Sequence, residues 1–181
     1  HMLIKGHRDI RESIAYDESS YSQESNRCMI AYWSTAYDLE ENYLKEEEKG
    51  LYKTVDGGYT WKNINSDLCD GTIKINPYNG DIYISKYDGI YYSSNKGESF
   101  EKIVNVTGKS DDIIRGLDLI ARGNQEINVY YCNNKGVYIS KDGKNFEIIE
   151  SSSYPTKQPM NIKVSPINPN EMIVIDRQGT Y

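Results

Sequence analysis

The chain has 181 residues, enough for one domain with its own hydrophobic core. Its formal net charge of −6 disfavours nucleic acid as a partner, because phosphates call for a basic face. No stretch approaches the ~20 apolar residues of a membrane span. The 17 tyrosines against two phenylalanines favour half-buried strands, and tyrosine also suits surfaces that meet sugars or peptides.

Few residues suggest metal, cofactor or histidine chemistry. The three cysteines form no C-x-x-C pair, so we expect core thiols rather than a zinc site or a disulfide framework. His1 and His7 both lie in the N-terminal tail, which argues against a histidine-based triad. We therefore predict no metal and no cofactor. The His-Met start is typical of a cloning remnant, so residues 1–9 are interpreted as tag remnant and tail. Whether the native protein carries a targeting segment is left open.

Residues 10–66 predict the first of several similar β units. The stretch Ile14–Trp33 predicts two strands joined by a loose turn. A long acidic insertion follows at Ser34–Lys49, for which we expect a loop with at most one helical turn. GLYKTVDGGYTWKNI, from Gly50, then predicts two further strands joined by a tight turn at Asp56.

The same succession of strands returns at 67–106 and 107–152, and begins again at 153–181. GIYYSSNKGESFEKI and GVYISKDGKNFEII repeat the second half of the unit, and strand pairs such as IKINPYNGDIYIS repeat the first. The turn residues Asp56, Asn95 and Asp142 are spaced 39 and then 47 residues apart, the period of a four-stranded propeller blade. The sequence therefore predicts an all-β, single-domain fold of about three complete antiparallel four-stranded blades and the start of a fourth.

The glycine-rich turn could also be a phosphate-binding loop, but it occurs three times, between strands, and lacks the Walker A pattern. A structural turn is the simpler interpretation. Asp or Asn binds nearby backbone amides, glycine supplies a positive φ, and the following aromatic residue packs into the blade. The residues concerned are Asp56, Gly58, Trp61, Asn95, Gly97, Phe100, Asp142, Gly143 and Phe146.

TVDGGYTW (Thr54–Trp61) resembles the Asp-box, or BNR repeat, [S/T]-x-D-x-G-x-[S/T]-W. Ser93–Phe100 is a close variant, and Ser140–Phe146 is one residue shorter. Asp-box propellers include sialidases, xyloglucan-type endoglucanases, sortilin-type receptors and photosystem assembly factors. The strand–turn–strand segments with Asn-Pro-Asn most resemble the xyloglucanase and sortilin branches. In this superfamily the box lies opposite the binding face, so the resemblance implies a fold and not a chemistry.

About three and a half blades cannot close a ring, since propellers usually have four to eight. We expect either a part of a longer propeller or open edges that pair with another chain or copy.

The loops opposite the boxes are where propellers normally bind. The insertion Ser34–Lys49 is the longest of them, and it places aromatic residues beside carboxylates, which suits sugar rings. Its candidate ligand-binding residues are Trp33, Tyr37, Asp38 and Tyr43. The alternative is a solvated acidic loop, with Tyr32 and Trp33 in the core.

Glycoside hydrolysis needs two carboxyl groups, and Asp88 and Asp176 lie at equivalent predicted turns. The resemblance to xyloglucanases implies a catalytic aspartate in a similar place. However, their motif, close to T-D-V-G-G, is replaced here by Lys86-Tyr87-Asp88-Gly89, and Asp-Gly also suits an ordinary turn. Asp70, Asp111 and Arg115 are further ligand-binding candidates, with an ion pair of Asp111 or Asp112 to Arg115 as the alternative.

The resulting hypothesis is a carbohydrate-directed propeller protein, possibly a glycoside hydrolase that acts on plant-type or other polysaccharide. The alternative is a non-catalytic, protein-binding propeller of the sortilin or assembly-factor kind. The expected partner is accordingly an oligosaccharide or a protein. A sialidase is disfavoured, because no FRIP-like stretch opens the chain. We expect a secreted or cell-surface bacterial protein, with a cytoplasmic location left open.

Overall fold

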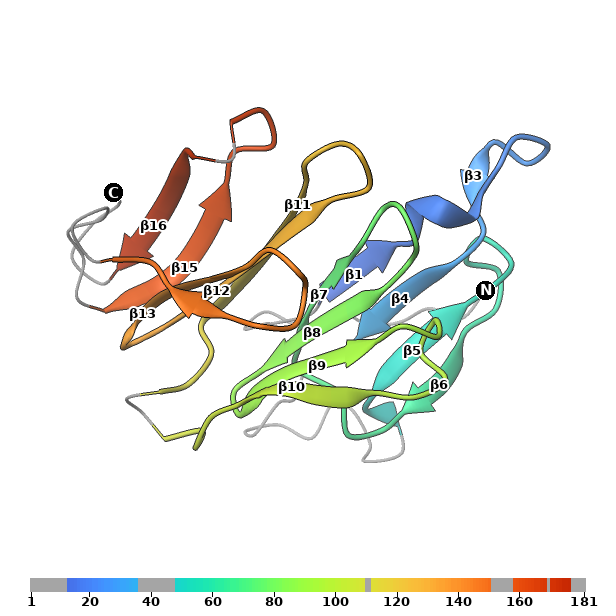
Figure 1. The fold of residues 1–181 in the computed structure, drawn as a ribbon. Helices are drawn as coiled ribbons and strands as arrows, with labels where there is room; N and C mark the ends of the chain where they lie inside the picture. Colours follow the sequence, from blue (N-terminus) through green and yellow to red (C-terminus); the bar gives the residue numbers. More distant parts are fainter. Residues whose placement is uncertain (1–12, 36–47, 110–111, 151–157, 169, 177–181) are drawn as a thin grey trace. The chain divides into compact units, whose positions relative to one another are not determined.

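The computed structural model describes residues 13–35, 48–109, 112–150, 158–168 and 170–176, and this described part is all-β. Three four-stranded sheets follow one another along the chain, then a sheet of two strands (Figure 1). The pairings within the sheets are antiparallel. The predicted all-β fold of antiparallel four-stranded sheets is confirmed. The tail 1–9 and most of the acidic insertion lie outside the described residues.

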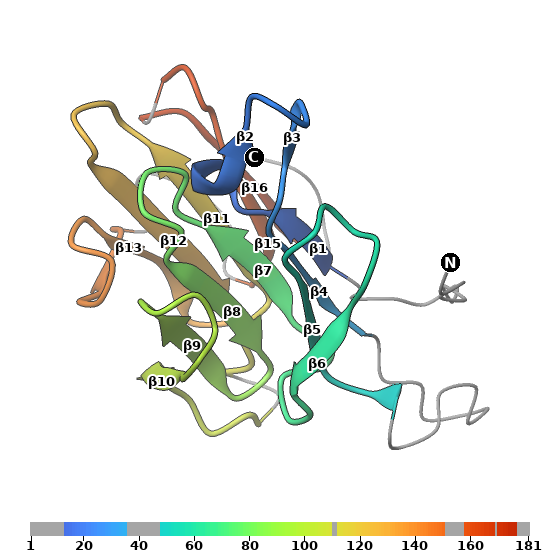
Figure 2. The same cartoon turned by 90° about the vertical axis from the view of Figure 1, so that its right-hand side faces the viewer.

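The first sheet has the strand order β1-β4-β5-β6. Its strands are β1 (Ser13–Tyr16), β4 (Ala31–Ser34), β5 (Leu51–Thr54) and β6 (Lys62–Asn65). Between β1 and β4 the chain forms a single 3-10 turn, η1 (Glu18–Ser20), and a short hairpin of β2 (Tyr21–Ser22) and β3 (Arg27–Cys28). The hairpin projects beyond the sheet (Figure 2). Sequence analysis treated this stretch as one loose turn and missed both features.

The remaining sheets repeat the same succession of strands, with orders β10-β9-β8-β7 and β11-β12-β13-β14, followed by the pair β15-β16. Their bounds are β7 (Thr72–Ile75), β8 (Ile82–Lys86), β9 (Gly89–Ser93), β10 (Glu101–Asn105), β11 (Gly116–Ala121), β12 (Ile127–Asn133), β13 (Gly136–Ser140), β14 (Glu147–Ile148), β15 (Pro159–Val164) and β16 (Met172–Asp176).

The inner strands are buried on both faces. Along β8, Ile82, Tyr83 and Ile84 are all covered, and β12 is buried over its whole length. A strand between two packed layers loses the polar–apolar alternation of a half-exposed strand, which explains its nearly continuous apolar sequence. In β15, by contrast, buried Ile162 and Val164 flank exposed Lys163, so one face of the last sheet is covered.

The chain divides into two compact units: residues 1–86 with 93–100, and residues 87–92 with 101–181. In the second unit, Ile120, Tyr130 and Val137 of the third sheet form one apolar cluster with Ile162 and Val174 of the last. A polar contact accompanies this packing, since the backbone N–H of Val164 donates to the buried Asp118 carboxylate at 2.9 Å.

A buried carboxylate links separate segments of the first unit. Asp17, whose side chain is 0% exposed, accepts hydrogen bonds from Ser19 N at 3.0 Å and from Lys96 Nζ at 3.1 Å. The Lys96 carbonyl in turn accepts from Tyr32 Oη at 2.9 Å and from Lys53 Nζ at 2.8 Å. Lys96 therefore binds the β1–β4 connection through its side chain and the strands β4 and β5 through its backbone.

We expect Lys96→Met to lower the free energy of unfolding by about 1–3 kcal/mol, because the buried Asp17 carboxylate loses its cation. The lysine side chain is 41% exposed, so solvent screening places the effect towards the low end of that range. Urea unfolding measures it. The control is Lys109→Met, which removes an exposed lysine without an ion pair to any described residue. A Lys96→Met protein as stable as the wild type would contradict this role for the pair.

Candidate functional site

Three segments of the second unit meet at the ends of its strands. They are the turn after β8 (Tyr87–Gly89), the described parts of the connection from β10 to β11 (106–109 and 112–115), and the turn between β12 and β13 (Asn133–Gly136). Val106 N donates to the Asp88 carbonyl at 3.1 Å, and Ile114 N donates to the Tyr87 carbonyl at 3.4 Å. An ion pair of Lys135 with Asp112 connects the last turn to the same connection. We call Tyr87, Asp88, Lys102, Asp112 and Lys135 the loop-end site.

Asp88 is held by two donors. Its Oδ2 accepts from Tyr91 Oη at 2.9 Å and from Lys102 Nζ at 2.6 Å. Burial alone would lower the pKa of Lys102, but the hydrogen bonds and charge attraction of Asp88 and Tyr91 raise it on balance. Burial, and then Asp88, raise the pKa of Tyr91. The raised pKa values keep Lys102 an ammonium and Tyr91 a neutral phenol at neutral pH, and both donate to Asp88, which is placed as a hydrogen-bond acceptor.

Asp112 has a similar arrangement. It is 5% exposed and accepts from Thr107 Oγ1 at 2.7 Å, Thr107 N at 3.2 Å and Lys135 Nζ at 3.4 Å. The hydrogen bond from the threonine hydroxyl is the main reason that the pKa of Asp112 is lowered. Both carboxylates of the loop-end site are thus paired with a lysine.

The ion pair expected between Asp112 and Arg115 is not formed. Asp112 binds Lys135 instead, and among the described residues Arg115 has no acidic partner. The Arg115 backbone N–H donates to the Cys132 carbonyl at 2.8 Å, while its Nε is buried without a hydrogen bond. Sequence proximity suggested the pair, but the turn Asn133–Gly136 brings a competing lysine from 23 residues away.

Tyr87 is a member of the loop-end site that sequence analysis did not single out. Its side chain is 52% exposed. Gly108, at φ +67°, packs against the ring so closely that a Cβ there would lie 3.0 Å from Cδ2 and 3.2 Å from Cε2. The glycine therefore packs against one part of a ring that is half exposed. The sequence could have indicated Tyr87, because it is an aromatic residue directly before the Asp88-Gly89 turn.

The other predicted site residues lie elsewhere. Trp33 is 8% exposed in β4 and packs against Tyr52 with ring centroids 5.3 Å apart, which agrees with the core interpretation. Asp70 belongs to the first unit, at φ +57°, and its N–H donates to the Thr35 carbonyl. Asp176 ends β16, opposite Pro159. Four candidates lie outside the described residues: Tyr37, Asp38, Tyr43 and Asp111.

The three repeated turns, called here the corner turns, share one hydrogen-bond pattern. Asp56 Oδ1 accepts from Thr60 N at 2.9 Å, and Asn95 Oδ1 accepts from Ser99 N at 3.0 Å, in each case four residues along. Asp142 Oδ1 accepts from Asn145 N at 2.8 Å, three residues along. The glycines take the positive φ that such a turn requires: +94° at Gly58, +84° at Gly97 and +80° at Gly143.

The corner carboxylates are unsuited to acid–base chemistry near neutral pH. Hydrogen bonds, first of all from the Thr60 hydroxyl, lower the pKa of Asp56 to about 2. Those from Asn145 lower the pKa of Asp142 further. Because Asn95 takes the same place in the second turn with a neutral amide, the geometry depends on the acceptor oxygen and not on the charge.

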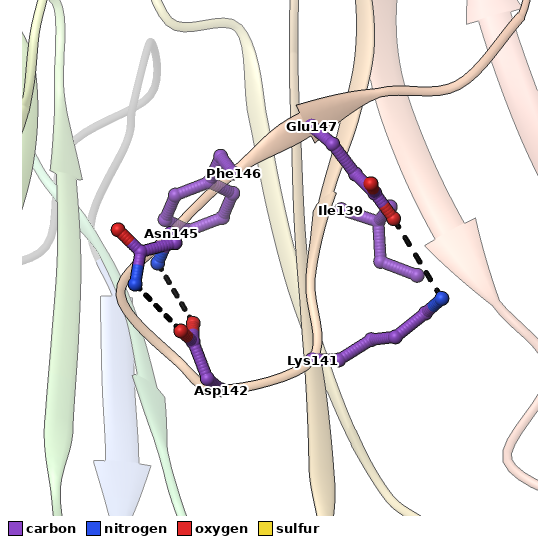
Figure 3. A pocket seen from close by; sticks show the side chains of 6 residues that line it. All are labelled: Ile139, Lys141, Asp142, Asn145, Phe146 and Glu147. Atoms are coloured by element: carbon purple, nitrogen blue, oxygen red, sulfur yellow. Dashed lines mark hydrogen bonds and ion pairs between the residues drawn. The ribbon is translucent and has the colours of Figure 1, made fainter.

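The third corner turn also borders an open hollow of about 370 Å³ (Figure 3). We call it the corner hollow; it is lined by Ile139, Lys141, Asp142, Asn145, Phe146 and Glu147.

Two further features bear on the chemistry. Burial raises the pKa of the Cys132 thiol to about 12, so it stays protonated, while Cys28 and Cys69 are free and half-buried rather than full core residues. Within the described part of the chain, no group of three His, Cys, Asp or Glu side chains could hold a metal. No helix found there is long and apolar enough to cross a membrane.

No family model and no curated protein matches the sequence. Solved structures do match. The GH74 enzyme of Niastella koreensis matches with a TM-score of 0.61 and 18% identity, and the match covers 92% of this chain and 28% of that one. An ancestral GH74 enzyme matches with a TM-score of 0.59 and 15% identity, covering 90% of this chain and 23% of that one. YCF48 bound to D1 peptide matches with a TM-score of 0.52, 16% identity, 99% of this chain and 53% of that one. The fold is that of a partial β-propeller. This chain spans about a quarter of the two GH74 enzymes and half of YCF48, and at such identities the propeller likeness concerns the fold alone.

The corner carboxylates predict a defined pH dependence of stability. Since the pKa of Asp56 is depressed in the folded chain, its contribution is present above the ordinary value of 3.8 and is lost as the pH falls towards about 2. Asp56→Asn should therefore lose less free energy of unfolding than the wild type as the pH falls below about 4. The reciprocal variant Asn95→Asp should lose more over the same range of pH. Urea midpoints measured between about pH 2 and pH 7 test both, and an unchanged pH slope in the two variants would contradict the assignment.

Proposed function

We propose that this propeller segment binds carbohydrate, without cleaving it, at the loop-end site. The observation that carries the proposal is the half-open ring of Tyr87, supported by Gly108 and followed directly by the ion-paired Asp88. An aromatic face beside polar donors and acceptors is the arrangement that sugar rings need, because their C–H faces are apolar and their hydroxyls both donate and accept.

The polar groups at the site suit hydroxyl recognition. The side chains of Asp88 and Lys102 are about a quarter exposed, at 25% and 27%, so a ligand hydroxyl can reach both while the pair keeps its geometry. A hydroxyl beside the pair would donate to the carboxylate and accept from the ammonium. The structural similarity to GH74 enzymes is compatible with a carbohydrate ligand.

Binding fits the site better than catalysis does. A glycoside hydrolase needs one carboxyl group that is protonated at the working pH, to act as general acid. Asp88 and Asp112 each pair with a lysine as hydrogen-bond acceptors, and the pKa of Asp112 is lowered, so the contacts place neither as a general acid. The finer proposals that Asp88 and Asp176 act as a catalytic pair, and that the corner turns are true Asp-boxes, have no comparable support.

We expect Tyr87→Ala to weaken oligosaccharide binding roughly three- to tenfold, because the stacking face is lost. Asp88→Asn should weaken it about tenfold or more, since a charged hydrogen bond is lost. Calorimetric titration with xyloglucan, β-glucan, chitin and pectin oligosaccharides measures both variants. Tyr78→Ala, which removes a tyrosine 38% exposed in a different turn, is the control.

Unchanged affinity in both Tyr87→Ala and Asp88→Asn would overturn the loop-end assignment. If the wild type releases reducing sugar and Asp88→Asn does not, the protein is catalytic, and the proposal that it binds without cleaving is wrong. The absence of binding to every class of saccharide would contradict the carbohydrate ligand altogether.

A second candidate function is protein binding. The structure of YCF48, which resembles 99% of this chain, was solved bound to a peptide. One face of β16 also presents Ile173 and Ile175, which are 50% and 40% exposed on either side of buried Val174. Exposed aliphatic side chains on a strand favour a protein partner over a sugar.

The two candidates respond differently to substitution. If the partner is a protein bound at β16, the double variant Ile173→Ser and Ile175→Ser should abolish capture of that partner by the purified chain, and Asp88→Asn should not. Loss of sugar binding in Asp88→Asn, together with unchanged binding in the serine double variant, would favour the loop-end site instead. Thermal unfolding of each variant checks that the fold is intact.

A further inference from the structure

The corner hollow lies at the turn between β13 and β14. Figure 3 shows two polar groups that frame it, Asp142 with Asn145 on one side and Lys141 with Glu147 on the other. The ring of Phe146 and the side chain of Ile139 lie between them. An apolar floor with a polar rim is thus formed by one short hairpin.

The aromatic part of the floor comes from the corner turn itself. Phe146 follows directly after the amide that Asp142 binds, as Trp61 and Phe100 follow the bound amides of the other two corner turns. The Phe146 ring meets Tyr131 edge-on, with centroids 5.1 Å apart, and Tyr131 stacks on Tyr138 at 4.5 Å. This row of rings fixes Phe146 from behind and leaves it half-buried.

The polar rim is available to a ligand. Lys141 Nζ and Glu147 Oε1 are 3.6 Å apart, and both side chains are exposed, at 68% and 70%. Such a surface pair contributes little to stability, so the two groups can exchange partners with ligand hydroxyls at small cost. Asn145 donates its side-chain N–H to Asp142 Oδ2 at 2.6 Å, which leaves the amide oxygen as a further acceptor.

The turn that carries the hollow also contacts the preceding sheet. Lys144, in the middle of the turn, pairs with Glu101 of β10 at 2.5 Å and lies 4.6 Å from the centroid of the Tyr92 ring. Both side chains of the ion pair are about half exposed, at 49% and 57%, so the pair contributes little to the stability of the turn.

We propose that the corner hollow binds a single neutral hexopyranose unit. Phe146 and Ile139 would contact the C–H face of the ring, and Glu147, Lys141 and Asn145 would bind its hydroxyls. The volume of about 370 Å³ is at the lower end for ligand pockets and suits one sugar ring rather than a polymer. Asp142 and Glu147 disfavour an anionic ligand. The corner hollow is separate from the loop-end site and does not depend on its assignment.

The test is an NMR titration of the full chain with methyl β-D-glucopyranoside and methyl β-D-galactopyranoside. Saturable shifts are expected at residues 139–147 with at least one of the two. Glu147→Gln should weaken the affinity about tenfold, because a charged hydrogen-bond acceptor becomes neutral. The matched control is Glu101→Gln, which neutralises the exposed partner of Lys144 in β10, outside the lining of the hollow, and should leave the affinity within about twofold of wild type.

The absence of saturable shifts at 139–147 with both sugars would overturn the proposal, and so would equal affinity of Glu147→Gln and wild type. Glu147 is a surface residue, so its substitution is compatible with folding, and Phe146→Leu adds a variant that keeps an apolar floor without the ring. Tyr87→Ala separates the two sites. It should leave the hexoside shifts unchanged, whatever it does to oligosaccharide binding at the loop-end site.

Discussion

The fold depends on one recurring interaction, the hydrogen bonds by which a side-chain oxygen closes the turn between the third and fourth strands of a sheet. Asp56, Asn95 and Asp142 occupy this place in three successive sheets. A tight turn there leaves backbone N–H groups without a strand partner, and the side-chain acceptor satisfies them locally. Because the closure is local, each sheet can form from a contiguous segment of the chain, and the architecture can repeat without long-range pairing.

The same turns also join successive sheets. Lys96 extends from the second corner turn to the buried Asp17, and Lys144 extends from the third to Glu101. A turn that is rigid on its own can direct a long cation to a fixed acceptor at little entropic cost. The difference between the two pairs is burial: Asp17 has no access to solvent, whereas Glu101 is more than half exposed, so only the first is expected to matter for stability.

The loop-end site combines two ion-paired carboxylates with a half-exposed aromatic ring, Tyr87, that directly precedes one of them in the chain. Asp88 and Asp112 are each held by a lysine and by a hydroxyl group, which orients both as hydrogen-bond acceptors. Tyr87 supplies the apolar surface beside them. Recognition of a neutral, hydroxylated ligand needs such preorganised acceptors and no reactive proton. The segments concerned are short, and their positions are set by backbone hydrogen bonds between neighbouring loops.

The sequence alone determined the all-β class, the succession of four-stranded sheets and the positions of the corner turns, because each rests on local patterns such as the Asp-Gly turn at Asp142 and the strand–turn–strand segment IKINPYNGDIYIS. It identified Asp88 as a turn residue but not its partners. Lys102 lies 14 residues away and Lys135 lies 23 residues from Asp112, and no local pattern encodes contacts between loops. Only the tertiary structure decided that Asp112 binds Lys135 rather than Arg115, that Trp33 is buried and that Tyr87 is half exposed. Those outcomes depend on which strand ends meet in space, and that follows from the packing of whole sheets.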